Sequence, residues 1–502
     1  MQRNPRRWLI LVVLLLSTLV LVIDNMVLTV AVPPLAEDLG ATAQDIQWII
    51  ESYILVFAGL LLAAGSLSDR FGRRRMLIIG LVIFGAASIL ATVADNPETL
   101  ILARVLMGIG GALVMPSTLS ILITVFDEKE RPKAIATWSA VAMVGLVGGP
   151  VLGGILIAKF WWGAVFVINI PIALLAIVSA LVLMPESKGP WRKADPLGML
   201  LSMVGMVALV WTIIEIPKHG LSATTITTIT VATASLLAFG IWEVRTTSPM
   251  IPLELFKNRI FTGASFSLVL LTFANGGLML VLTQYLQFVE GYTPTETGLA
   301  FAPLAIASLA CNSLGAALAQ KLGNRALAVA GLLVIAAGFG ALAMMNGTTS
   351  LIIAMIILGS GAGLAMPAAI GALMGAVPAE HAGVGSALND TIQQAGAALG
   401  VAVLGSVLSG TYTNEMPDSA PEPAKSSITD ALAVAAQLKD NALADAARDA
   451  FASAMSGSFL AGAAGVVGAA ILAFFLMRDS GNAQDATEPE PVEEVKEAMM
   501  LS

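Results

Sequence analysis

Cysteine, histidine and charged residues are all scarce in this 502-residue chain. Its single cysteine, Cys311, excludes an intrachain disulfide and a Cys-x-x-Cys redox motif. Its two histidines, His219 and His381, are far apart in the sequence and leave little for a metal site. We see no phosphate loop, metal-ligand cluster or nucleophile triad, so we expect neither an enzyme nor a bound cofactor or metal.

Only 12% of the chain is charged, while 57% is hydrophobic. Soluble proteins carry roughly 25% charged residues, so this composition indicates an all-α polytopic membrane protein. The net charge of −8 comes largely from two segments, an alanine-rich region at 411–455 and a tail at 479–502. We interpret the first as a long external loop with an amphipathic helix from Ser427, and the second as a disordered acidic cytoplasmic tail.

Fourteen apolar runs are each near the ~20 residues that a helix needs to cross the hydrocarbon core. The first run is too long for a signal-peptide core and continues into the polytopic pattern, so we expect it to be retained as a membrane anchor. The expected spans are 8–31, 46–64, 76–94, 98–123, 134–158, 163–184, 197–216, 222–242, 261–286, 297–320, 326–345, 350–375, 383–409 and 457–477.

Lysine and arginine are distributed unequally between the two sides of these spans. If the N-terminus is cytoplasmic, 20 of the 26 basic residues lie on the cytoplasmic side, five lie outside and Arg104 lies within the membrane. Such an excess sets membrane orientation. We therefore expect a multi-pass protein of the bacterial inner membrane with both termini in the cytoplasm.

The chain also repeats itself, because Gly108–Pro116 (GIGGALVMP) matches Gly359–Pro367 (GSGAGLAMP) at an offset of 251. An even number of spans separates the copies, so the two halves are parallel repeats, which place a substrate site near mid-membrane. The alternative is chance recurrence of small residues in apolar helices. We expect six-helix bundles at 1–185 and 259–478, with two inserted helices at 186–258.

A charged turn, GSLSDRFGRRR at Gly65–Arg75, separates the second and third spans. Its pattern resembles the loop between helices 2 and 3 of the major facilitator superfamily, a group of secondary transporters. Asp69 can pair with a cation or cap a neighbouring helix, which would hold the inner side shut. The alternative is that the turn only sets topology. The candidate gate residues are Gly65, Asp69, Arg70, Gly72, Arg73 and Arg74.

Three further motifs resemble those of the same superfamily. LARVLMGIGG at 102–111 is similar to its conserved-arginine motif, and GLVGGPVLGG at 145–154 is similar to its antiporter motif. IDNMVLTVAVP at 23–33 resembles the signature of the fourteen-helix drug:proton antiporters, whose best-known members are QacA-type and LfrA-type multidrug pumps. The resemblance implies proton-driven efflux of amphipathic, cationic drugs by a monomer in the lipid bilayer. The antiporter-motif residues are Gly145, Gly148, Gly149, Pro150, Gly153 and Gly154.

Ionisable residues inside spans are costly to insert and are therefore functional candidates. Asp24, Glu51 and Arg104 fall at similar depths in the outer half of the first bundle, and Asp390 falls in the inner half of the second. Our hypothesis is that Asp24 binds either a proton or a cationic drug, that Arg104 tunes Asp24 or Glu51, and that Asp390 is a second protonation or recognition site. Each of the three acids has the alternative of a structural hydrogen bond.

Aromatic and methionine side chains within the spans are candidates for lining a drug site, although they can equally face lipid. Some relatives carry two acids on the thirteenth helix, whereas Gln394 occupies the later position here, so a two-acid site is in doubt. The alternatives to a broad drug pump are an exporter of one endogenous metabolite or antibiotic and a non-transporting membrane sensor. The candidate lining residues are Phe57, Trp138, Phe273, Met279, Tyr285, Phe301 and Gln394.

Overall fold

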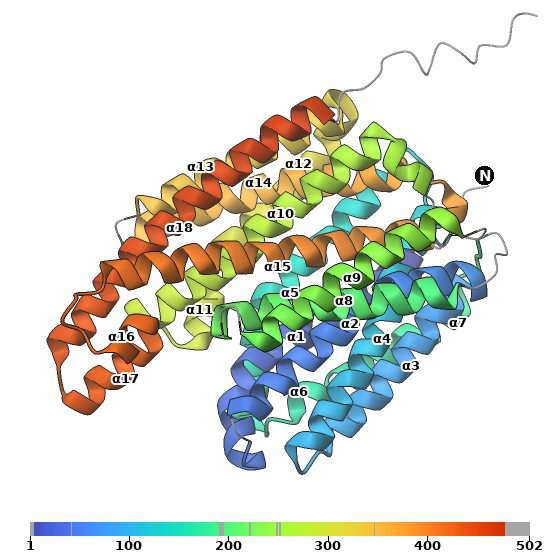
Figure 1. Cartoon of the computed structure of the whole chain (residues 1–502). Helices are drawn as coiled ribbons and strands as arrows, with labels where there is room; N and C mark the ends of the chain where they lie inside the picture. Colours follow the sequence, from blue (N-terminus) through green and yellow to red (C-terminus); the bar gives the residue numbers. More distant parts are fainter. Residues whose placement is uncertain are drawn as a thin grey trace, which may run out of the picture.

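The computed structural model of the chain is all-helical over the residues it describes (Figure 1). These are residues 5–41, 43–189, 195–219, 222–246, 249, 251, 253–345 and 347–476, so the expected tail at 479–502 lies outside them. Within this part of the chain, 12 helices are long and apolar enough to cross a membrane. Two more, α5 (Arg131–Lys159) and α8 (Pro196–His219), are 29 and 24 residues long but are not among the 12.

The helices of the first half pack against one another, with α3 on α4, α2 on α4 and α1 on α5. The corresponding helices of the second half do the same, with α13 on α14, α12 on α14 and α10 on α15. The first group is α1 (Arg7–Leu39), α2 (Ala43–Phe71), α3 (Arg73–Thr92), α4 (Pro97–Val125), α5, α6 (Ala164–Val167) and α7 (Asn169–Leu183). The second is α10 (Arg259–Gln284), α11 (Pro294–Ala300), α12 (Ala302–Leu322), α13 (Asn324–Ala343), α14 (Thr348–Gly375), α15 (Ala382–Glu415) and α18 (Asn441–Leu476).

The sequence repeat extends to the helices themselves. The starts of α2, α3, α4 and α5 recur, at the same offset as the repeated motif, as the starts of α11, α13, α14 and α15. A Cβ on Gly80 would lie 2.7 Å from the Gly110 carbonyl, and a Cβ on Gly331 would lie 2.7 Å from the Gly361 carbonyl. Small residues therefore allow the same close helix crossing in both halves.

Two long helices lie outside these groups. The helices α8 and α9 (Ala223–Arg245) pack on each other, and α8 also contacts α2 and α15, which belong to different halves. Figure 1 shows this pair in green beside α15 and α2. The pair therefore covers one side of the seam between the halves.

The structure differs from the expected boundaries in two places. The expected sixth span is present as one membrane-length segment, Ala164–Leu183, but its α-helix is interrupted at Ile168 between α6 and α7. The expected external loop at 411–455 is mostly helical, comprising the end of α15, α16 (Glu422–Ser426), α17 (Ile428–Leu438) and the first turns of α18. The helix expected from Ser427 is confirmed as α17, which Ser427 caps. Ile428 of α17 and Phe451 of α18 are buried with Tyr412 of α15, so this region has an apolar core.

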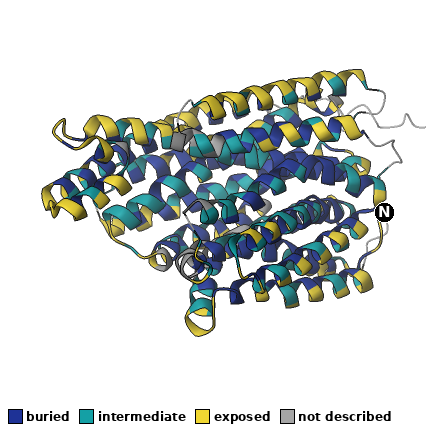
Figure 2. Ribbon diagram, turned by 60° about the horizontal axis from the view of Figure 1, so that its bottom comes forward, coloured by how far each residue is buried: buried dark blue, intermediate teal, exposed yellow. Residues whose placement is uncertain are grey.

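Large apolar side chains are exposed along the outward faces of the helices. Ile89, Leu102 and Val182 are each more than half exposed within helices, and Figure 2 shows exposed residues on the periphery around a buried interior. Such faces are stable in lipid, where backbone groups are satisfied within each helix. The chain is a multi-span membrane protein.

Candidate functional site

A buried ion pair joins α1 to α4. Asp24 Oδ2 accepts a hydrogen bond from Arg104 Nη1, and the two residues are only 2% and 1% exposed. Arg104 lies seven residues after Pro97, where α4 begins, which is roughly 10 Å along the helix. The pair is therefore closer to the end of the molecule where α4 begins than to the end that carries the Gly65–Arg75 turn, here called the arginine end.

Polar groups from three other helices complete this ion-pair site. Asn169 Nδ2, at the start of α7, donates to Asp24 Oδ1 at 2.8 Å and also lies 3.3 Å from Ser88 Oγ of α3. Arg104 Nε donates to the Ile49 carbonyl at 3.1 Å. Both carboxylate oxygens are thus engaged by nitrogen donors, one from α4 and one from α7.

Glu51 is not among the described contacts of this ion pair. The Arg104 guanidinium lies 4.4 Å from the centre of the Tyr53 ring, and it donates to Ile49. Ile49 and Tyr53 are four residues apart on one face of α2, whereas Glu51 is offset by two and points to another face. Glu51 is half-buried.

The antiporter-motif glycines hold α5 against the part of α1 that carries Asp24. A Cβ at Gly145 would collide with Val22, and a Cβ at Gly149 would collide with Met26. Val22 and Met26 flank Asp24 in the sequence, so a side chain at either glycine would push the acid out of position. Of the other motif glycines, Gly148 has open space beside it, Gly153 is buried and Gly154 is half-buried. The side chain of Pro150 lies outside the described part of the structure.

A cavity of about 130 Å³ lies between the two halves, bounded by α1, α4 and α5 on one side and by α10, α12, α13, α14 and α15 on the other. The repeated motif contributes to both sides, because Met115 and Met366 are equivalent positions of the two copies and both line the cavity. Its polar lining residues are Thr18, Ser139, Thr272, Asn275, Ser308, Asn312 and Gln393.

All described lining residues are uncharged, so Asp24, Glu51, Arg104 and Asp390 lie outside the lining. Among the aromatic and methionine candidates, Trp138 lines the cavity, and its Nε1 donates to Thr18 Oγ1 at 3.1 Å. Phe57 instead stacks on Tyr53 with ring centres 5.7 Å apart. The described lining contains Gln393 but not the remaining candidates, Phe273, Met279, Tyr285, Phe301 and Gln394.

Asp390 is a second buried acid, on α15. It is 4% exposed, and Asn389 Nδ2 donates to its Oδ1 at 2.9 Å. Its Oδ2 is buried without a hydrogen-bond partner among the described residues, and the same is true of Ser386 Oγ. An unsatisfied buried acceptor costs about 1–3 kcal/mol, and more if it is charged.

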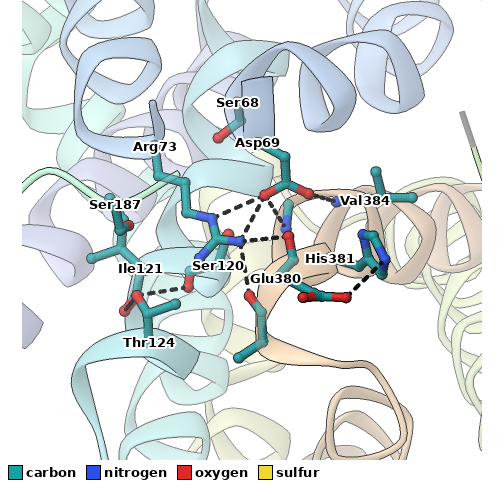
Figure 3. Close-up of polar contacts among 12 residues, drawn as sticks. Ser68, Asp69, Arg73, Ser120, Ile121, Thr124, Ser187, Glu380, His381 and Val384 are labelled. Atoms are coloured by element: carbon teal, nitrogen blue, oxygen red, sulfur yellow. Dashed lines mark hydrogen bonds and ion pairs between the residues drawn. The ribbon is translucent and has the colours of Figure 1, made fainter. Parts of the chain in front are cut away.

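Asp69 joins the two halves at the arginine end (Figure 3). Its Oδ1 accepts a hydrogen bond from the backbone N–H of Gly383 at 2.9 Å, and its Oδ2 accepts one from Val384 at 3.0 Å. These N–H groups belong to the first turn of α15, where a helix attracts negative charge. A Cβ at Gly65 would collide with Ala387, so glycine is needed for this close approach.

Arg73 extends the same contact. Its Nη2 donates to Asp69 Oδ1 at 2.8 Å and to the Ala379 carbonyl at 2.9 Å, and its side chain is 1% exposed. Arg74 Nη1 donates to the Met184 carbonyl at 2.9 Å, whereas Arg70 is half-buried beside Phe71. Gly72 has φ +118°, which strains any other residue. These contacts tie α2 and α3 to the segment that begins α15 at the arginine end.

Sequence reasoning missed three contributors to these sites. Asn169 and Asn312 were detectable as polar residues within apolar spans. Tyr53 gave no such signal, because an aromatic residue in a span equally suits a lipid-facing position.

Three comparisons relate the chain to known proteins. Residues 14–401 match the profile of the Major Facilitator Superfamily. The chain is 37% identical to the multidrug efflux pump LfrA of Mycolicibacterium smegmatis, covering 90% of this chain and 93% of that protein. It is 35% identical to the methyl viologen resistance protein SmvA of Salmonella typhimurium, over 89% and 93% of the two chains. The human organic anion transporter MFSD10 shares its fold, with a TM-score of 0.65, 14% identity and 94% and 100% coverage.

Proposed function

This chain belongs to the major facilitator superfamily and is a transporter rather than an enzyme. From that premise we propose that it exports amphipathic, mostly cationic drugs and dyes in exchange for protons. Export is supported by the names of its relatives, a multidrug efflux pump and a methyl viologen resistance protein. The driving force is the proton gradient, and we expect no cofactor. Each charge moved through 100 mV provides ~2.3 kcal/mol, and each pH unit ~1.4 kcal/mol.

The membrane arrangement that we propose has fourteen spans, with α5 and α8 added to the 12 helices that meet the length and hydropathy criteria. The bundles at 1–185 and 259–478 would move as two bodies, with α8 and α9 as inserted helices. We propose that the arginine end and both termini face the cytoplasm, because basic residues are enriched on that side. The protein would work as a monomer in the bacterial inner membrane.

The observation that carries proton coupling is the Asp24–Arg104 ion pair, buried beside the central cavity but outside its described lining. Drug and proton therefore occupy different places, and their competition is indirect. A proton on Asp24 neutralises the carboxylate and loosens its hold on Arg104 and Asn169. Because Gly145 and Gly149 pack against Val22 and Met26, movement of α1 is transmitted to α5, which lines the cavity.

Alternating access requires that only one end of the cavity is open at a time. The contacts of Asp69 with the first turn of α15 close the arginine end, which favours release toward the opposite side. We propose that breaking these contacts exposes the cavity to the cytoplasm for drug loading. Asp390 would be a second protonation site, because it lies on the helix that Asp69 holds.

The test is efflux of ethidium and a panel of unrelated drugs from energised cells, with and without an uncoupler. Proton-coupled multidrug export predicts uncoupler-sensitive efflux of several compounds, and Asp390→Asn should lower its rate at least about fivefold. Protection against one compound only would instead indicate a dedicated exporter. Ligand binding without flux would indicate a sensor and contradict the proposal.

A further inference from the structure

The central cavity contains an amide whose carbonyl oxygen has no partner within the described protein. Asn312 lies in the middle of α12, is 3% exposed and lines the cavity. Its Oδ1 is buried and accepts no hydrogen bond from any described residue. Buried side-chain amides are nearly always hydrogen-bonded. The Asn312 oxygen is therefore available to accept a hydrogen bond from a molecule that enters the cavity.

The repeat indicates that helix packing does not require an amide at this position. A Cβ at Gly108 of α4 would meet the Tyr53 carbonyl of α2, and a Cβ at Gly359 of α14 would meet the Leu304 carbonyl of α12. Gly359 and Leu304 each lie 251 residues after Gly108 and Tyr53, which is the offset of the repeat. The two contacts are therefore equivalent, and α2 and α12 align at this offset. Asn312 then corresponds to Leu61, which is fully buried in the apolar core. A leucine at this position of the repeat is therefore compatible with the fold.

The surroundings of Asn312 suit a flat aromatic ligand with a polar edge. Ser308, one helical turn earlier, also lines the cavity, and Trp138 and Phe339 supply aromatic surface there. Since the described lining carries no charge, a cation whose charge is spread over rings suits this cavity better than a compact ammonium. An amide both donates and accepts hydrogen bonds, so it can pair with an N–H or a C=O group.

We propose that Asn312, assisted by Ser308, is the hydrogen-bonding subsite that recognises the polar edge of the transported molecule. This rests on the proposed function and deepens it by naming a specificity-determining residue. A site built around a buried hydrogen-bonding group discriminates against ligands that lack the matching group, because the protein group then stays unpaired. Molecules with ring amino or carbonyl groups are favoured over equally apolar cations without them.

The experiment compares two probes on the full chain in lipid nanodiscs. Ethidium carries two ring amino groups, whereas tetraphenylphosphonium has no hydrogen-bonding group. Asn312→Leu should raise the Kd for ethidium about fivefold to tenfold, the effect of one lost hydrogen bond, and change the Kd for tetraphenylphosphonium less than twofold. Ser313→Ala is the matched control, because Ser313 is the next residue of α12 but is exposed and outside the described cavity lining. Asn312→Ser, which replaces the amide with a smaller hydrogen-bonding hydroxyl, should recover part of the ethidium affinity.

Equal weakening of both probes, or no change for either, would overturn the subsite while leaving drug export intact. The wild-type chain gives a second measurement that needs no folded variant. It should bind ethidium more tightly than the phenanthridinium analogue without the amino groups, and equal affinities would contradict the proposal. If the wild type binds neither ethidium nor tetraphenylphosphonium, broad drug recognition fails first, and the subsite falls with it.

Discussion

Arg104 of α4 and Met355 of α14 occupy equivalent positions in the two copies of the repeat, and both are almost completely buried at 1% and 0% exposure. Only the first has an acid partner, Asp24. Helix packing at this position of the repeat therefore tolerates an uncharged side chain. Met355 cannot form the ion pair that Arg104 forms in the first half. We infer that its charge serves coupling rather than folding.

A double variant tests this inference. Asp24→Asn with Arg104→Met should melt within a few degrees of the wild type, since a neutral pair replaces an ion pair of similar volume. Arg104→Met alone leaves a buried carboxylate without its partner and should cost about 3–5 kcal/mol. Thermal unfolding in detergent followed by tryptophan fluorescence measures both. A single variant as stable as the double variant would contradict the inference.

The contacts of Asp69 with α15 predict a shift in conformational equilibrium. Asp69→Asn weakens two hydrogen bonds from backbone N–H groups to a charged acceptor, each worth about 1.5–3 kcal/mol, and should open the arginine end at least about tenfold more often. Spin labels at the exposed positions Arg75 and Lys321, in a Cys311→Ala background, report the distance across this end.

The control for the gate is Asp95→Asn, the same chemical change at an exposed site after α3. A longer distance component should be present in Asp69→Asn and absent from the control. Identical distance distributions in Asp69→Asn and the wild type would show that the carboxylate does not hold the end closed.

The glycine motif of α5 predicts unequal effects at neighbouring positions. Gly149→Ala places a Cβ against Met26, and overpacking of this kind costs about 1–3 kcal/mol, so dye efflux should fall at least about tenfold. Gly148→Ala meets open space and should retain most of the activity. Efflux rates divided by the amount of protein in the membrane give the comparison, and equal losses would show that the contact with α1 is not the cause.

Substitutions of Trp138 should weaken drug recognition to different degrees. Trp138→Phe keeps an aromatic face in the cavity but loses the hydrogen bonds to Thr18 and Thr118, whereas Trp138→Ala loses both features. The dye concentration for half-maximal efflux should rise modestly in the first variant and about tenfold or more in the second, the effect of roughly 1.5 kcal/mol. Equal values for the two would mean that the ring face contributes nothing.

The sequence was sufficient for the membrane class, the family and the repeat, because hydropathy, arginine placement and the glycine motifs are local properties. It also placed Asp24 and Arg104 at similar depth, since depth follows from the constant rise per residue along a helix. It could not predict that Asn169 binds Asp24 or that Glu51 faces elsewhere, because rotation of each helix depends on its neighbours. Which side chains line the cavity depends on the same helix rotations. Trp138 and Phe57 are equal candidates from the sequence, and of these two only Trp138 is in the described lining.

The most direct test of proton-for-drug exchange is ethidium uptake by inverted vesicles under an imposed pH gradient, comparing the wild type with Asp24→Asn. We predict uphill uptake by the wild type that an uncoupler abolishes. Asp24→Asn should lose this uptake yet still exchange ethidium for ethidium without a gradient, because the described lining of the cavity does not include Asp24. Uphill, uncoupler-sensitive uptake by Asp24→Asn at the wild-type rate would contradict the account.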